Sequence, residues 1–209
     1  GKSLSPYVSA RSFFRYEEAD ITDLTFLTAP ALRRYIGGDL TISSSWGINR
    51  NVLDHYRDPS KGAKHDFNFQ LAGLGGDNEY YKFEHDSTWY WPLDDDKKWI
   101  LSYRTREGWV NDYGSSKEVP IQARFFCGGS SSVRGFDNRD VGPKLRRYYF
   151  LGEKEAIGGE LKLVENIEVK YKIAEMLRAY LFSDAGTVWR EANDFDLGDI
   201  KYSMVSASA

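Results

Sequence analysis

Cysteine and histidine are scarce in this sequence, and the scarcity excludes several kinds of site. Of 209 residues, one is cysteine and three are histidine. A single cysteine, Cys127, excludes an intrachain disulfide and a cysteine-based zinc site. The histidines His55, His65 and His85 do not have the spacing of a histidine metal motif. We therefore expect neither a metal nor a cofactor.

An excess of positive charge is also missing. Lys and Arg number 28 against 31 Asp and Glu, which leaves a net charge of -3. Domains that bind nucleic acid carry a basic excess, so nucleic acid is not an expected partner. The sequence contains no Gly-x-Ser-x-Gly elbow for a nucleophilic serine. These absences predict a protein that is not an enzyme.

Long apolar runs are absent, yet a membrane location is not excluded. No run approaches the roughly 20 apolar residues of a membrane-spanning helix. Transmembrane β-strands instead alternate apolar and polar residues, so their mean hydropathy cancels. Residues 160–173 show this alternation, interrupted only at Val164 and Glu165. We expect one set of side chains to face lipid and the other to face the lumen: Leu161, Leu163, Ile167 and Val169 outward, and Lys162, Asn166, Glu168 and Lys170 inward.

The same period-two pattern recurs along the chain and predicts about eight strands without a convincing helix. In residues 80–91 the apolar face is diluted by His85 and Ser87. Short turns such as 92–98 alternate with long connections at 18–36, 112–158 and 186–198. Short turns on one rim and long loops on the other are typical of outer-membrane barrels. The predicted fold is all-β, an antiparallel transmembrane β-barrel domain over residues 1–209; the alternative is a soluble sandwich or lipocalin-like barrel.

One glycine- and serine-rich segment, GGSSSVRGFDNRDVGPK at 128–144, has an Arg-Gly-Phe point at its centre. Such composition ordinarily indicates only a loop. A second interpretation is that Gly135 allows a tight turn that presents Arg134 to a carboxylate and Phe136 to a pocket. In that interpretation Gly128 and Gly129 frame the loop.

Several segments, taken in order, resemble the barrel domain of the BamA-like outer-membrane protein-assembly superfamily. They are DHYRDPSKG, DNEYYKF, WPLDDDKKW, GGSSSVRGF with the following GP, GGELKLVENIEVKY and LRAYLFSDAGTVW. The resemblance covers most of the chain. It implies a sixteen-stranded barrel, of which this chain resembles strands seven to fourteen, and a loop at 112–158 that folds into the lumen with Val133, Arg134, Gly135 and Phe136 at its tip.

The resemblance also implies that the tip arginine pairs with acidic residues on the next two strands. Glu168 and Asp184 both lie on the polar parity of their strands. A short turn near 174–175 joins these strands, so the two acids should lie within about three positions of one level. A planar guanidinium can engage two carboxylates at once. We expect Phe136 to pack beneath the arginine.

By resemblance, the function is assembly and insertion of β-barrel proteins in the bacterial outer membrane without nucleotide. The implied partners are outer-membrane lipids, unfolded β-barrel clients and assembly-complex lipoproteins. Alternatives are a TamA-like or two-partner-secretion barrel, the membrane anchor of a surface protein, or a porin. A closed barrel of about eight strands has an interior filled by side chains. A long inward loop does not fit there, so we expect 7–17 and 199–206 to be edge strands.

Overall fold

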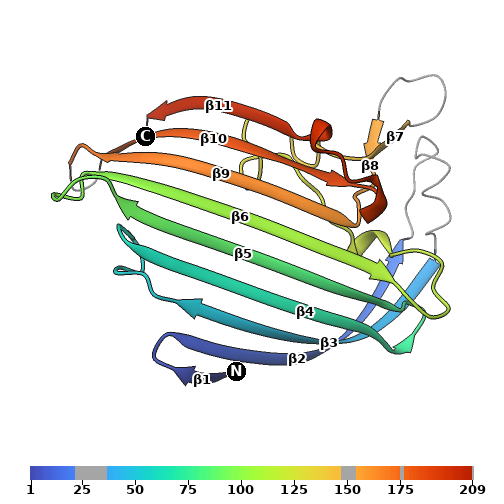
Figure 1. Ribbon diagram of the computed structural model, residues 1–209. Coiled ribbons are helices and arrows are strands. Elements are labelled where there is room, and N and C mark those ends of the chain that lie inside the picture. Colours follow the sequence, from blue (N-terminus) through green and yellow to red (C-terminus); the bar gives the residue numbers. More distant parts are fainter. Residues whose placement is uncertain (22–36, 147–153, 175–176, 209) are drawn as a thin grey trace.

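The computed structural model describes residues 1–21, 37–146, 154–174 and 177–208. Its described elements are β-strands and short 3-10 turns, arranged as one large curved sheet with a small separate hairpin (Figure 1). Within the described ranges, no helix has the length and apolar character needed to cross a membrane. The expectation of an all-β fold is confirmed.

The main sheet has nine antiparallel strands. Its order is β1-β2-β3-β4-β5-β6-β9-β10-β11, so every strand pairs with its neighbours along the chain except at the junction of β6 with β9. The strands are β1 (Lys2–Ser5), β2 (Val8–Ile21), β3 (Gly37–Asn51), β4 (Gly62–Gly76), β5 (Tyr80–Pro92), β6 (Trp99–Asp112), β9 (Leu161–Lys172), β10 (Arg178–Trp189) and β11 (Lys201–Ser208).

The eight long strands correspond to the eight expected from the period-two pattern. The edge assignment is half wrong, because the short strand β1 pairs with β2 and takes the edge that we expected residues 7–17 to occupy. β11 lies at the other edge, as expected. Parts of two expected connections, 22–36 and 147–153, lie outside the described residues, as does Glu175 of the turn near 174–175.

The connection between β6 and β9 leaves and re-enters the sheet at neighbouring strands and lies across one sheet face behind β9 to β11 in Figure 1. It contains a 3-10 turn, η2 (Ile121–Ala123), and the hairpin strands β7 (Lys144–Arg146) and β8 (Lys154–Ala156). We call the sheet face that it covers the inner face and the opposite one the outer face.

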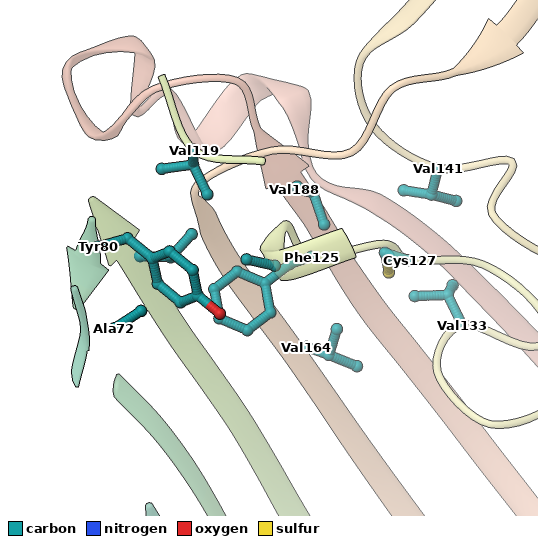
Figure 2. Close-up of a cluster of buried hydrophobic side chains, with 11 residues drawn as sticks. Ala72, Tyr80, Val119, Phe125, Cys127, Val133, Val141, Val164 and Val188 are labelled. Atoms are coloured by element: carbon teal, nitrogen blue, oxygen red, sulfur yellow. The ribbon is translucent and has the colours of Figure 1, made fainter. Parts of the chain in front are cut away.

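A buried apolar cluster joins the inner face to the long loop (Figure 2). The sheet contributes Ala72, Tyr80, Val110, Val164 and Val188, and the loop contributes Val119, Ala123, Phe125, Cys127, Val133 and Val141. Val164 is the one apolar residue among the inward-facing polar positions of β9, and it lies where the loop packs against the sheet. Gly108 of β6 leaves space for Phe125, because a Cβ at this glycine would lie 2.5 Å from the ring.

Large apolar side chains are exposed on the outer face. They include Trp46, Ile48, Phe67, Phe69, Phe83, Trp91, Trp99, Trp109, Ile167, Leu181, Tyr202 and Met204. The register places these positions on the parity opposite to the loop contacts. An exposed apolar face across a whole sheet is what lipid contact requires, whereas a soluble sandwich would bury it.

Candidate functional site

The loop tip depends on three glycines with positive φ. Gly128, Gly129 and Gly135 have φ values of 108°, 94° and 87°, a region that residues with a Cβ rarely adopt. A Cβ at Gly128 would also lie 2.5 Å from the carbonyl oxygen of Asp137. The Gly128 amide donates a hydrogen bond of 2.8 Å to the Ser132 hydroxyl. The backbone conformation at these glycines is therefore fixed and would not accommodate a residue with a side chain.

Arg134 lies between the two carboxylates that the sequence singled out. Its Nε and Nη2 donate to the two oxygens of Asp184 at 2.6 and 2.7 Å, and its Nη1 lies 2.7 Å from Glu168 Oε1. Its backbone amide donates to Asp184 Oδ2 at 3.0 Å. The planar guanidinium thus makes a bidentate contact with one acid and a single contact with the other. We call these three residues the latch.

Asp184 is fully buried, with 0% of its surface exposed. The Asn166 amide, directly opposite on β9, donates 2.7 Å to its Oδ1. Glu168 pairs with Phe182, two positions from Asp184 along β10. A buried carboxylate is costly unless it is paired and hydrogen-bonded, and Asp184 receives four hydrogen bonds, three of them from Arg134.

The aromatic residue under the arginine is not the one expected. Arg134 Cζ lies 3.6 Å from the centroid of the Phe182 ring, a cation–π contact. Phe136 packs against the apolar cluster instead. The backbone turns at Gly135, so the side chains of Arg134 and Phe136 point to different places. Phe182 has the same inward parity as Asp184.

Two residues that hold the loop were missed as site residues. Arg106 of β6 donates from Nη2 to Asn166 Oδ1 at 2.8 Å, and its Nη1 donates to the Ser131 carbonyl. Asn166 Nδ2 donates to the Ser132 carbonyl at 2.8 Å. Both side chains lie at the alternating polar positions of their strands, which face the inner side of the sheet. Their proximity depends on the pairing of β6 with β9 across the loop, which local sequence does not show.

The electrostatics of the loop suit a structural site. The hydrogen bond to Asp184 raises the pKa of Arg134, although burial opposes this. Burial raises the pKa of the Cys127 thiol, which fits packing in the cluster better than nucleophilic chemistry. Among the described residues, no group of three or more His, Cys, Asp or Glu side chains is arranged to hold a metal.

The chain is similar to outer membrane protein assembly factors and to a SAM50-like protein. BamA of Neisseria meningitidis, named an outer membrane protein assembly factor, is 36% identical over 149 residues, covering 69% of this chain and 18% of that protein. A SAM50-like protein of Schizosaccharomyces pombe is 29% identical over 174 residues, covering 79% and 35%. The crystal structure of Haemophilus ducreyi BamA lacking POTRA domains 1-3 matches with a TM-score of 0.65 at 28% identity, covering 73% of this chain and 31% of that one.

The chain therefore spans between about a fifth and about a third of the length of these relatives. The names of the relatives describe assembly factors rather than enzymes, and they come from bacterial and eukaryotic organisms. Residues 3–206 match the Omp85 superfamily domain. This match shows that the chain, with its antiparallel sheet and lipid-compatible outer face, belongs to the Omp85 superfamily.

Proposed function

We propose that this chain is part of the barrel of an assembly factor that inserts β-barrel proteins into the bacterial outer membrane. The observation that supports this most is the latch: Arg134 at the tip of a 48-residue connection, residues 113–160, engages Asp184 and Glu168 on the inner wall. Its partners are outer-membrane lipids, unfolded β-barrel clients and, at the level of the complex, lipoproteins.

The role of the latch is mechanical. In the described part of the loop, the attachments to the sheet include the latch, the apolar cluster and the hydrogen bonds of Arg106 and Asn166. With the loop docked, β6, β9 and β10 are tied together across the inner face. The inner face of these strands then keeps one shape while a client strand is added to the barrel. This role requires neither a nucleotide nor a covalent step.

The test is insertion of a client barrel by the full-length parent protein, reconstituted in lipid vesicles. Arg134→Ala should reduce the insertion rate at least about tenfold if the docked loop is needed, since two charged contacts disappear. Arg139→Ala is the matched control, because Arg139 lies in the same loop, is exposed and contacts the Phe126 ring rather than the latch.

Two results would contradict the proposal. One is equal insertion by the Arg134→Ala variant and the unmodified protein. The other is transport of a soluble passenger across the vesicle membrane with no client insertion, which would favour a two-partner-secretion or TamA-like function for the same fold.

A further inference from the structure

On β4, β5, β6 and β9, the apolar outer face contains a connected group of polar side chains. Its members face outward from four consecutive strands of the sheet, and we call them the outer-face chain: His65 of β4, His85 and Ser87 of β5, Thr105 and Glu107 of β6, and Glu165 of β9. On β6 they lie between the outward-facing Trp99 and Trp109. Aromatic residues at both ends of a strand mark the membrane interfaces, so the chain lies at the level of the lipid tails.

Hydrogen bonds connect neighbouring members of the outer-face chain. His65 Nδ1 lies 2.7 Å from the Ser87 hydroxyl, which lies 2.5 Å from His85 Nε2. His85 Nδ1 lies 3.0 Å from Glu107 Oε2. These contacts link three strands by side chains alone.

Thr105 continues the connection to a second acid. Its hydroxyl donates to Glu165 Oε1 at 2.8 Å and to Glu107 Oε1 at 3.1 Å. One hydroxyl hydrogen thus serves two carboxyl groups. The second oxygen of Glu165 is buried and has no hydrogen-bond partner among the described residues. The four carboxylate oxygens at the acidic end of the chain face the hydroxyls of Thr105 and Tyr103 and the ring of His85.

No strong cation of the same strands compensates these acids. On β4, β5, β6 and β9 every lysine and arginine has the inward parity: Lys64, Lys82, Arg104, Arg106, Lys162, Lys170 and Lys172. Glu107 and Glu165 are the carboxylates of the outer parity on these strands, and their basic neighbours are histidines. Ionisable groups among lipid tails are expensive and are normally paired or functional.

Glu107 is the accessible member. Its side chain is 47% exposed, whereas that of His85 is 16% exposed and Ser87 and Thr105 are buried. The His85 ring stacks on the Phe67 ring of the neighbouring strand β4, with the ring centroids 4.2 Å apart. The Glu107 carboxylate is thus oriented by its hydrogen bonds to His85 and Thr105 and by the ring stacked on His85. A side chain that is already oriented loses less entropy when a partner binds.

We propose that the outer-face chain is a docking site, within the membrane, for a membrane-spanning segment of a partner protein that carries a lysine or arginine opposite Glu107. Charge complementarity identifies this occupant, because Glu107 and Glu165 contact no lysine or arginine among the described residues. The outward-facing Arg50 of β3 lies beside His65, at the opposite end of the outer-face chain. Lipid tails have no donors. A second copy of this chain in a two-fold contact at this site would bring like carboxylates together. The inference does not depend on the latch or on the proposed function.

The experiment places a photoreactive residue at Leu163, which is paired with Glu107 across β6 and β9 and has outward parity. The full-length parent is irradiated in its own membranes, and the adduct is identified by peptide mass spectrometry. We expect an adduct with a membrane-spanning segment that contains Lys or Arg. Glu107→Asp should retain it and Glu107→Gln should reduce its yield about tenfold or more, as truncation of a desolvated charge pair predicts.

Two matched controls separate docking from folding. A photoreactive residue at Leu181, which is 58% exposed on the outer face of β10, should not give this adduct. Glu84→Gln removes a carboxylate of the inner parity on β5 and should leave the Leu163 adduct unchanged. Equal folded barrel in all variants, seen by electrophoretic mobility with and without heating, is required for the comparison.

Four outcomes would overturn the proposal: no adduct at Leu163, an adduct with lipid only, an adduct with a second copy of the chain, or a yield that Glu107→Gln leaves unchanged. Failure of the proposed function is distinguishable, because Arg134→Ala is expected to slow client insertion and does not change the outer face. The Leu163 adduct should survive in that variant.

Discussion

The two faces of the same strands differ in how their carboxylates are paired. On the inner face, Asp184 and Glu168 both pair with Arg134, which the loop brings to them from a distant part of the sequence, and Lys170 Nζ lies 3.7 Å from Glu168. On the outer face, Glu107 and Glu165 have histidine and threonine neighbours but no lysine or arginine. An acid in a low-dielectric place needs a countercharge. The inner face supplies arginine and lysine, whereas the outer face offers Glu107 only a histidine, His85, at 3.0 Å.

Adjacent residues of β9 belong to the two systems. Asn166 donates to Asp184 on the inner face, and Glu165 accepts from Thr105 on the outer face. Because side chains alternate along a strand, these two neighbouring residues lie on opposite faces. Asn166 belongs to the site that contains Arg134, whereas Glu165 belongs to the site that has no lysine or arginine beside its acids. The difference indicates that the inner site serves to hold the chain together, while the outer site is directed toward another molecule.

The largest expected effect is the loss of the inner countercharge. Arg134→Ala leaves fully buried Asp184 without its cation, and removing one partner of a buried pair costs about 3–5 kcal/mol. Docking of the loop should weaken accordingly. Limited proteolysis of residues 113–146 in the detergent-solubilised parent should show cleavage at least about a hundredfold faster.

Substitutions that alter the geometry test whether the contact is direct. Arg134→Lys should recover only part of the protection, because an ammonium group lacks the planar fork that contacts both oxygens of Asp184. Combining Arg134→Glu with Asp184→Arg should protect the loop better than either change alone. If the double variant is no better than the single ones, the pair does not determine docking.

Much of this arrangement could be predicted from sequence because the strands are so regular. Period two assigned residues such as Glu168, Asp184 and Ile167 to their correct faces, and the short turn between two strands brought the acids to one level. The resemblance supplied the Arg134 tip. Local alternation and hairpin connection are properties of a few consecutive residues, so they can be read without long-range information.

The features that the sequence did not predict depend on the pairing of β6 with β9, two strands that the long loop separates in the sequence. Nothing local shows that Arg106 of β6 lies beside Asn166 of β9, or that Phe182 rather than Phe136 lies under Arg134. The interruptions of the pattern at Val164, Glu165, His85 and Ser87 were visible as exceptions. Their meaning became clear only with the register, which places Val164 under the loop and the other three on the outer face.

A smaller effect is expected at the apolar part of the inner attachment. Gly108→Ala would place a Cβ 2.5 Å from the Phe125 ring, and that ring is held between the ammonium groups of Lys82 and Lys162 at 4.4 and 4.8 Å. Overpacking of this kind costs about 1–3 kcal/mol. Proteolysis of the loop should accelerate less than in Arg134→Ala.

Gly47→Ala provides the matched control for this substitution. Gly47 is also a strand glycine of inner parity, but its Cβ would meet the flexible side chain of Arg11 rather than a fixed ring. We expect its effect to be within about 0.5 kcal/mol. Similar loop release in both variants would mean that strand distortion, not the Phe125 contact, causes the change.

The aromatic support of the latch should contribute less again. Phe182→Leu removes the ring below the Arg134 guanidinium and keeps an apolar side chain, so about 0.5–2 kcal/mol should be lost. Phe126→Leu removes the comparable ring below Arg139, 4.4 Å from its Cζ, in the same loop. Hydrogen exchange of the Arg134 amide should accelerate in the first variant only; acceleration in both would remove the distinction between the rings.

The smallest expected effect concerns a third carboxylate, at the rim where the loop returns to β9. Burial raises the pKa of Glu160 to about 7 from the usual 4.5, with Arg124 opposing and Asp112 adding to the shift. A raised folded-state pKa means that the folded rim binds the proton more tightly. The stabilisation is complete below pH 4.5 and is lost as pH rises through 7.

Glu160 accepts a backbone hydrogen bond of 2.9 Å from the Val110 amide, which gives a local probe of the rim. Exchange of that amide, corrected for its intrinsic pH dependence, should accelerate modestly between pH 5 and 8. Glu160→Gln, which cannot ionise, should remove the slope and slow exchange at pH 8. An unchanged slope in this variant would show that the pH dependence of exchange at the rim does not come from the Glu160 carboxyl group.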